Sequence, residues 1–125
     1  MIGIVSDTHG RTDAARKAGG LLAGRGVTRV IHCGDIVAAS VVDQFSQFET
    51  TYVWGNTDFD RGSLRRYIKS VGGAVGEPFA KVQVDGRVIA ATHGDDGRLL
   101  RRLIDAGRHD YVLHGHTHEP RDERV

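Results

Sequence analysis

The stretch IGIVSDTHG (residues 2–10) joins a short apolar run to a cluster of polar side chains, and this combination recurs along the chain. The run 2–5 is typical of a buried strand, and Asp7 and His9 follow it at once. Four later strand-like runs also end in glycine together with Asp, Asn or His. Because ligands bind beyond the carboxyl ends of parallel strands, we expect these clusters to meet at one rim of a sheet.

Strand-like and helix-like segments alternate along most of the chain. Apolar spacing predicts strands at 29–33, 51–54 and 111–113 and helices at 12–23, 39–48, 63–69 and 97–106. Asp85-Gly86, between the runs 79–84 and 87–91, is a strong hairpin signal. The alternation predicts an α/β fold with right-handed crossovers and a largely parallel sheet, with helices on its outer faces.

Composition is that of one globular domain, which we expect to span residues 1–125. Hydrophobic residues make up 39% and charged residues 26% of the chain, and the formal net charge is +1. Such a balance gives no overall field that would indicate nucleic acid or an anionic membrane as partner. No run has transmembrane length or the form of a secretory signal. A single cysteine, Cys33, excludes an internal disulfide and favours a cytoplasmic location.

Two Asp-x-His or His-x-His pairs are candidate metal ligands. In an extended chain, alternate side chains point to the same side, so Asp7 and His9 could hold one ion. His116 and His118 repeat this spacing near the end of the chain. Alone, the pair Asp7 and His9 would more often be a turn-forming Asp with a surface histidine, whereas three histidines within residues 114–118 are harder to explain in that way.

Three further residues extend the candidate ligand set. Asp35 and Asn56 each follow a glycine, which lets the backbone approach an ion or substrate closely. His93 lies at a strand end between Thr92 and Gly94, where a histidine alone would more often belong to the core. Together with the two pairs, they supply enough oxygen and nitrogen ligands for two divalent cations that share one carboxylate.

Five motifs carry a family resemblance. They are SDTHG (6–10), CGD (33–35), GNTD (55–58), THG (92–94) and GHTH (115–118). In this order they resemble the motifs of calcineurin-like metallophosphoesterases, specifically the small bacterial and archaeal phosphodiesterase branch. The resemblance spans nearly the whole chain. It implies an αββα sandwich of mixed, largely parallel sheets with helices on the outer faces, and a dinuclear metal site.

The resemblance also implies a role for each candidate residue. It assigns Asp7, His9 and His118 to the first metal, Asn56, His93 and His116 to the second, and Asp35 to both. Asp35, Asn56 and Asp58 are the candidate catalytic residues. Asp58 would either orient a ligand from outside the metal site or stabilise a turn.

The implied activity is hydrolysis of a small phosphoester by hydroxide held at the dinuclear centre, with a phosphodiester as the preferred substrate class. Oxygen and imidazole ligands without thiolate suit Mn²⁺, our first choice, and also Zn²⁺, Fe, Ni²⁺ or Mg²⁺. The alternative is a non-catalytic binding scaffold, because a scaffold subunit of the retromer coat resembles this fold with a degraded metal site. Matching residues at all seven ligand positions favour the enzyme.

Two features depart from the family pattern. Many larger relatives have a histidine acid at the position of Thr57, and a threonine hydroxyl cannot donate a proton near neutral pH. Turnover should therefore depend on the acidity of the leaving group. The family usually continues with further strands after GHTH, whereas this chain stops at Val125. We therefore expect an incomplete sheet edge and, as one remedy, a homo-oligomer.

Overall fold

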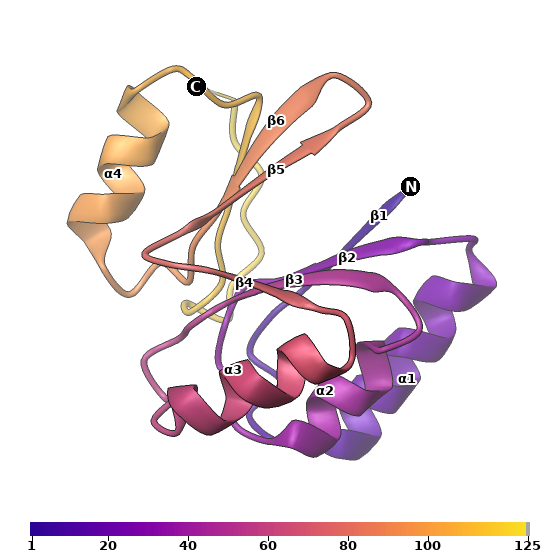
Figure 1. The fold of residues 1–125 in the computed structure, drawn as a ribbon. Helices are drawn as coiled ribbons and strands as arrows, with labels where there is room; N and C mark the ends of the chain where they lie inside the picture. Colours follow the sequence, from indigo (N-terminus) through magenta and orange to yellow (C-terminus); the bar gives the residue numbers. More distant parts are fainter. Residues whose placement is uncertain (125) are drawn as a thin grey trace.

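A computed structural model, which describes residues 1–124, has two stacked β-sheets (Figure 1). The first sheet is parallel and contains, in spatial order, β1 (Ile2–Val5), β2 (Arg29–His32), β3 (Glu49–Val53) and β4 (Ala74–Gly76). The second contains β5 (Ala80–Val84), β6 (Arg87–Ala91) and β7 (Tyr111–Leu113), with β5 antiparallel and β7 parallel to β6. The predicted α/β sandwich of largely parallel sheets is confirmed.

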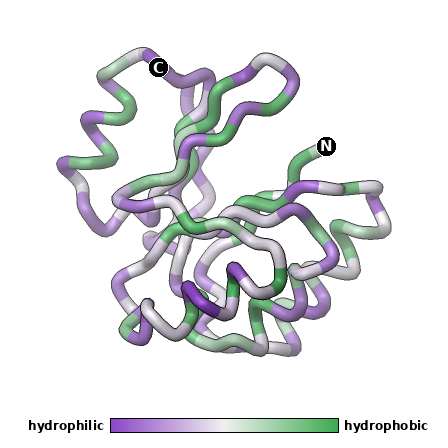
Figure 2. The backbone as a smooth tube through the Cα atoms, in the orientation of Figure 1, coloured by the Kyte–Doolittle hydropathy of each residue, from purple (hydrophilic) through white to green (hydrophobic). Residues whose placement is uncertain are grey.

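Helices cover the outer face of each sheet (Figure 1). On the first sheet lie α1 (Thr12–Gly24), α2 (Ala39–Phe45) and α3 (Arg61–Ser70), and on the second lies α4 (Gly97–Asp105). Figure 2 shows hydrophobic and hydrophilic residues alternating along α4, as expected for a helix that buries one face. Within residues 1–124, no helix is long and apolar enough to cross a membrane.

Three apolar clusters hold the layers together. The helices on the first sheet pack through Ala15, Phe45 and Ile68, the sheets meet through Ile31, Val53 and Ile89, and α4 places Leu99 and Leu103 on Ala90. Each cluster removes large aliphatic or aromatic side chains from water, which is the main stabilising term in folding. The packed layers fix the strand ends, and therefore the starting points of the loops that follow them.

Turn residues and side-chain hydrogen bonds explain the ends of the hairpin strands and of α2. Both residues of the predicted hairpin turn are left-handed, with φ of 50° at Asp85 and 77° at Gly86, as a type I′ turn requires. Helix α2 ends at Phe45, before the predicted boundary at 48, because the Thr50 hydroxyl donates to the Phe45 carbonyl at 2.9 Å and turns the chain into β3. Strand β4 was not predicted, since it is only three residues long and follows two glycines.

Backbone pairing continues past the strand ends into the motif loops. The Asp7 amide donates to the Gly34 carbonyl at 2.9 Å, and the His9 amide donates to the Asp35 carbonyl at 2.8 Å. On the second sheet, the Gly115 amide donates to the His93 carbonyl at 2.9 Å. The loops therefore lie in register beside one another, and this register sets where their side chains meet.

Candidate metal centre

Two motif glycines lie where no side chain would fit. A Cβ on Gly55 would lie 2.1 Å from Asp35 Oδ1, and a Cβ on Gly115 would lie 2.4 Å from Asp7 Oδ2. Real Cβ atoms do not approach oxygens so closely. The glycines of GNTD and GHTH thus allow neighbouring loops to close around the two carboxylates, which creates a compact cradle for ligand atoms.

Left-handed backbone is concentrated at the candidate ligands. Seven non-glycine residues among 1–124 have positive φ, and five of them are candidate ligands, namely Asp7, His9, Asp35, His116 and His118. Asp, Asn and His tolerate this region better than most residues, but such strain persists only where the surrounding structure imposes it. Our extended-chain explanation of the pairs at 7/9 and 116/118 is wrong, because turns, not strand alternation, aim these side chains.

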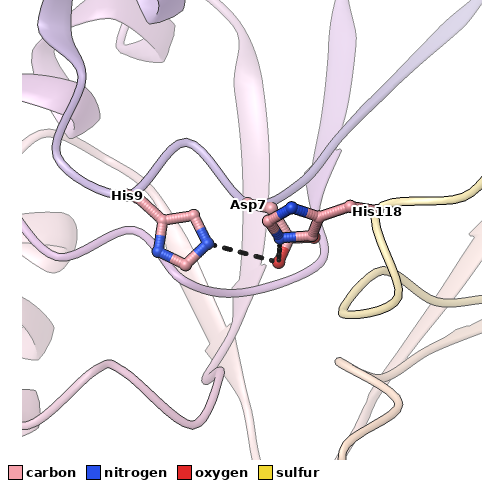
Figure 3. Close-up of side chains that lie close together, drawn as sticks. All are labelled: Asp7, His9 and His118. Atoms are coloured by element: carbon pink, nitrogen blue, oxygen red, sulfur yellow. Dashed lines mark hydrogen bonds and ion pairs between the residues drawn. The ribbon is translucent and has the colours of Figure 1, made fainter.

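The first ligand group joins the two ends of the chain. Asp7 Oδ1 lies 3.6 Å from His9 Nε2 and 3.2 Å from His118 Nε2. Figure 3 shows both imidazoles lying close to the Asp7 carboxylate, from segments at opposite ends of the sequence. One ligand atom from each of the three residues lies within 4.8 Å of the others, as a shared cation requires.

The second group is built around His93, which is 1% exposed. Its Nε2 lies 3.1 Å from Asp35 Oδ2 and 2.9 Å from Asn56 Oδ1. Its Nδ1 lies 2.7 Å from the Cys33 carbonyl, which can only accept a hydrogen bond. The proton of neutral His93 is therefore on Nδ1, and the Nε2 lone pair faces the site, as is typical of a metal-binding histidine.

Asp35 lies between the two groups. Its Oδ2 is 3.3 Å from His9 Nε2 and 3.1 Å from His93 Nε2, and the side chain is nearly inaccessible to water. Its Oδ1 accepts a hydrogen bond from the Thr57 amide at 3.0 Å, which holds the carboxylate in this orientation. An oxygen placed between two imidazoles is where a bridging ligand would lie.

His116 lies at the edge of this arrangement. Its ring centroid is 5.1 Å from that of His93, and its amide donates to Asp7 Oδ2 at 3.0 Å. The two close groups of ligand atoms found among residues 1–124 do not include its imidazole. The structure thus links six of the seven candidate ligands through a series of pairwise side-chain contacts and places the seventh ring beside them.

The donor set fits divalent cations. Burial by itself raises the pKa of Asp7, but hydrogen bonds from Ser6 and the His116 amide and the charge of His93 lower it overall. His9 Nε2 is buried and has no hydrogen-bond partner among the described residues. Oxygens of Asp7 and Asp35 lie within 4.8 Å of each other. Two close carboxylates facing imidazole nitrogens suit a cation that satisfies all of them.

Asp58 supports the site from behind. Its Oδ2 accepts hydrogen bonds from the amides of Asp35 and Gly55, both at 2.9 Å, and its Oδ1 accepts one from the Val37 amide at 2.8 Å. Its carboxylate therefore holds the loops that carry Asp35 and Asn56. The contacts are compatible with both roles that the sequence left open, because the bond from Gly55 stabilises the GNTD turn and the bond from the Asp35 amide orients the loop of a candidate ligand.

Asp58→Asn should lower activity by roughly 10- to 100-fold, the usual cost of losing an outer partner of a metal ligand. An amide group cannot accept hydrogen bonds at both oxygen positions, so at least one loop amide loses its partner. The measurement is kcat at saturating Mn²⁺. Asp60→Asn is the matched control, because Asp60 is exposed and makes no side-chain cap hydrogen bond. Equal activities of the two variants would contradict the supporting role.

His32, behind the site, predicts a loss of stability in acid. Burial lowers its pKa to about 3 from 6.5, His93 acts in the same direction, and the charges of Asp7 and Asp35 oppose it. Below the unfolded pKa, the unfolded chain binds a proton that the folded chain does not. The contribution of neutral His32 to the free energy of unfolding is therefore complete above pH 6.5 and is lost as the pH falls toward 3. Over this range the free energy of unfolding should fall by up to about 1.4 kcal/mol per pH unit.

Urea unfolding of the metal-free protein across this pH range is the measurement. His32→Phe has no such titration, so its unfolding free energy should fall less steeply between pH 6.5 and pH 3. Parallel curves for the parent and His32→Phe would contradict this assignment.

Comparison with known proteins agrees with the fold and with the predicted phosphoesterase activity. The family model of the calcineurin-like phosphoesterase superfamily domain matches residues 1–125. A phosphodiesterase of Methanocaldococcus jannaschii is 35% identical over 127 residues, covering 99% of this chain and 76% of its own length. The solved structure of an archaeal phosphodiesterase superposes with a TM-score of 0.90 at 34% identity, covering 99% of this chain and 77% of that one.

A structure from Streptococcus pneumoniae, described as a predicted phosphoesterase, has a TM-score of 0.67 at 23% identity and shares the fold. The matched region covers 96% of this chain and 63% of the S. pneumoniae chain. The chain belongs to the calcineurin-like phosphoesterase superfamily. It is a hydrolase of phosphoesters, and the family implies divalent metal ions at the candidate centre.

Proposed function

We propose that this protein is a phosphodiesterase that uses two divalent cations, with Mn²⁺ as the first choice. The observation that carries the proposal is the position of Asp35 Oδ2, 3.3 Å from His9 Nε2 in one group and 3.1 Å from His93 Nε2 in the other. In this proposal the seven ligands predicted from the sequence hold the two ions, with Asp35 shared. The related phosphodiesterase of M. jannaschii supports a diester as substrate.

The charges of the site suit a phosphate group. Asp7 and Asp35 contribute two negative charges, so two divalent cations would leave a centre of about +2 that attracts a phosphate anion. When bound, such ions acidify a water molecule and polarise the phosphoryl oxygens. Asp35 holds the two ligand groups together, Asn56 contributes a neutral oxygen, and Asp58 keeps both loops in place.

The test compares two chromogenic substrates, bis(p-nitrophenyl) phosphate and p-nitrophenyl phosphate. Protein stripped with EDTA should be inactive, Mn²⁺ should restore hydrolysis, and the diester should be the better substrate. Metal analysis of protein purified without chelator should find about two ions per chain. A protein that binds Mn²⁺ and hydrolyses neither ester would favour the binding scaffold instead.

Self-association is a further part of the proposal. β1 and β7 are edge strands of the two sheets, and Ile4 on β1 and Tyr111 on β7 are 53% and 55% exposed. Exposed edges with large apolar side chains favour pairing with another copy of the chain. We expect light scattering to show a dimer or larger species whose population falls on Ile4→Lys. A strictly monomeric parent over a wide concentration range would contradict it.

We also propose the cytoplasm as the site of action. Cys33 is fully buried, and burial raises its pKa to about 12, so it remains a neutral thiol. A free thiol in this state suits a reducing compartment. Cell fractionation with an antibody against the protein would test the location.

A further inference from the structure

His32 is a fully buried histidine that neither candidate ligand group includes. It ends β2, and its ring centroid lies 5.6 Å from that of Tyr52 and 5.9 Å from that of Phe45. An apolar residue could fill this space without the cost of burying two polar nitrogens. Both nitrogens have partners, and both partners belong to loops that carry candidate metal ligands.

The hydrogen bonds of His32 have a definite direction. The Gly34 amide donates to Nδ1 at 3.1 Å, so Nδ1 carries no proton. In the neutral ring the proton is then on Nε2, which donates to Thr8 Oγ1 at 3.0 Å. The Thr8 hydroxyl in turn donates to the Asp35 carbonyl at 3.4 Å. These bonds form a relay from Gly34 through His32 and Thr8 back to Asp35.

These hydrogen bonds connect the loop that carries Asp7 to the loop that carries Asp35. Thr8 lies between Asp7 and His9, and Gly34 directly precedes Asp35. Fixing Thr8 against Asp35 therefore limits how far the Asp7 and His9 side chains can move relative to the bridging carboxylate. We propose that His32 is a positioning residue of the metal centre, acting through Thr8 and Gly34 to set the spacing of the two ligand groups; this inference rests on the proposed function.

The experiment measures Mn²⁺ affinity by calorimetry in the parent and three single variants. His32→Phe keeps the aromatic packing and removes both hydrogen bonds, and Thr8→Val removes the hydroxyl alone. Thr50→Val is the matched control: Thr50 is also buried, but its hydroxyl bonds the carbonyls of Phe45 and Phe48, away from the ligand loops. Urea unfolding of each variant without metal measures the purely structural cost.

We expect His32→Phe and Thr8→Val each to weaken Mn²⁺ binding by roughly 10-fold or more. Their double variant should be little weaker than either, because both break the same relay. Thr50→Val should lose stability and keep the parent's affinity, and His32→Gln, which can still donate to Thr8, should recover part of the loss. Parent-like Mn²⁺ affinity in His32→Phe would overturn the inference while leaving the proposed function intact.

A second readout does not depend on metal. In ¹⁵N NMR of the metal-free protein, His32 should show a protonated Nε2 and an unprotonated Nδ1 near neutral pH. The opposite tautomer would reverse the relay and overturn the inference even if the parent binds no Mn²⁺. Absence of Mn²⁺ binding by the parent would by itself refute the proposed function.

Discussion

Asp35→Asn is expected to abolish Mn²⁺ binding and phosphodiester hydrolysis together. The loss should exceed the roughly 10- to 100-fold that follows removal of an outer partner, because a shared ligand is removed. Asp35 Oδ2 lies 3.3 Å from His9 Nε2 and 3.1 Å from His93 Nε2. The variant takes away the negative charge between these imidazoles, and an amide nitrogen in that place cannot coordinate a cation.

The fold of Asp35→Asn should survive without metal. Oxygens of Asp7 and Asp35 lie within 4.8 Å, so two like charges repel each other in the metal-free protein and the substitution relieves this repulsion. Thermal unfolding with and without Mn²⁺ separates the two effects. The parent should gain about 2.7 kcal/mol for each bound ion at a concentration of 100 Kd, and the variant should gain nothing.

Asp13→Asn is the matched control for this substitution. Its carboxylate is 86% exposed on α1, so the variant should bind Mn²⁺ and hydrolyse diesters like the parent. An Asp35→Asn protein with full metal content and full activity would rule out the shared role of Asp35.

The meeting of the motifs at one rim was predictable from the sequence. Each motif follows an apolar run, and ligands bind beyond the carboxyl ends of such strands, so a common rim could be expected. That Asp7 follows β1 of one sheet while His118 follows β7 of the other could not, because the sequence does not show how the strands divide between two sheets. The hairpin at Asp85-Gly86 was predictable for the same kind of reason, since the turn type depends on two adjacent residues. Such features require only local chemistry and general rules of topology.

Other features depend on contacts that no local pattern encodes. The left-handed backbone at Asp7 and Asp35 lies where neighbouring loops approach closely at Gly115 and Gly55, and an extended-chain argument cannot anticipate it. The sequence did not indicate the positioning role proposed for His32. Its hydrogen-bond partners are a hydroxyl at Thr8 and a backbone amide at Gly34, which only the β1–β2 register brings together. One sequence signal existed, namely a polar residue in an otherwise apolar strand.

Rates for a series of phosphodiesters should fall steeply as the pKa of the leaving group rises. Thr57 stands where larger relatives place a histidine acid, and its hydroxyl is buried without a hydrogen-bond partner among the described residues. A threonine hydroxyl cannot protonate the departing alkoxide near neutral pH, and general acid catalysis typically contributes about 10²- to 10⁴-fold. Aryl esters, whose leaving groups need no proton, should therefore react faster than alkyl esters, which lose the contribution of a positioned acid.

The measurement is the slope of log kcat against leaving-group pKa at saturating Mn²⁺. Thr57→His should flatten this slope if the imidazole reaches the leaving oxygen, whereas Thr57→Val should leave it steep, because the parent hydroxyl donates nothing to the leaving group. The Thr57 amide, which holds Asp35 Oδ1 at 3.0 Å, is present in all three proteins, so metal binding should be similar. A flat slope in the parent, with chemistry rate-limiting, would mean that another residue supplies the proton. His114, half-buried directly before the GHTH loop, and Asp95, exposed after the THG motif, would then be the first residues to substitute.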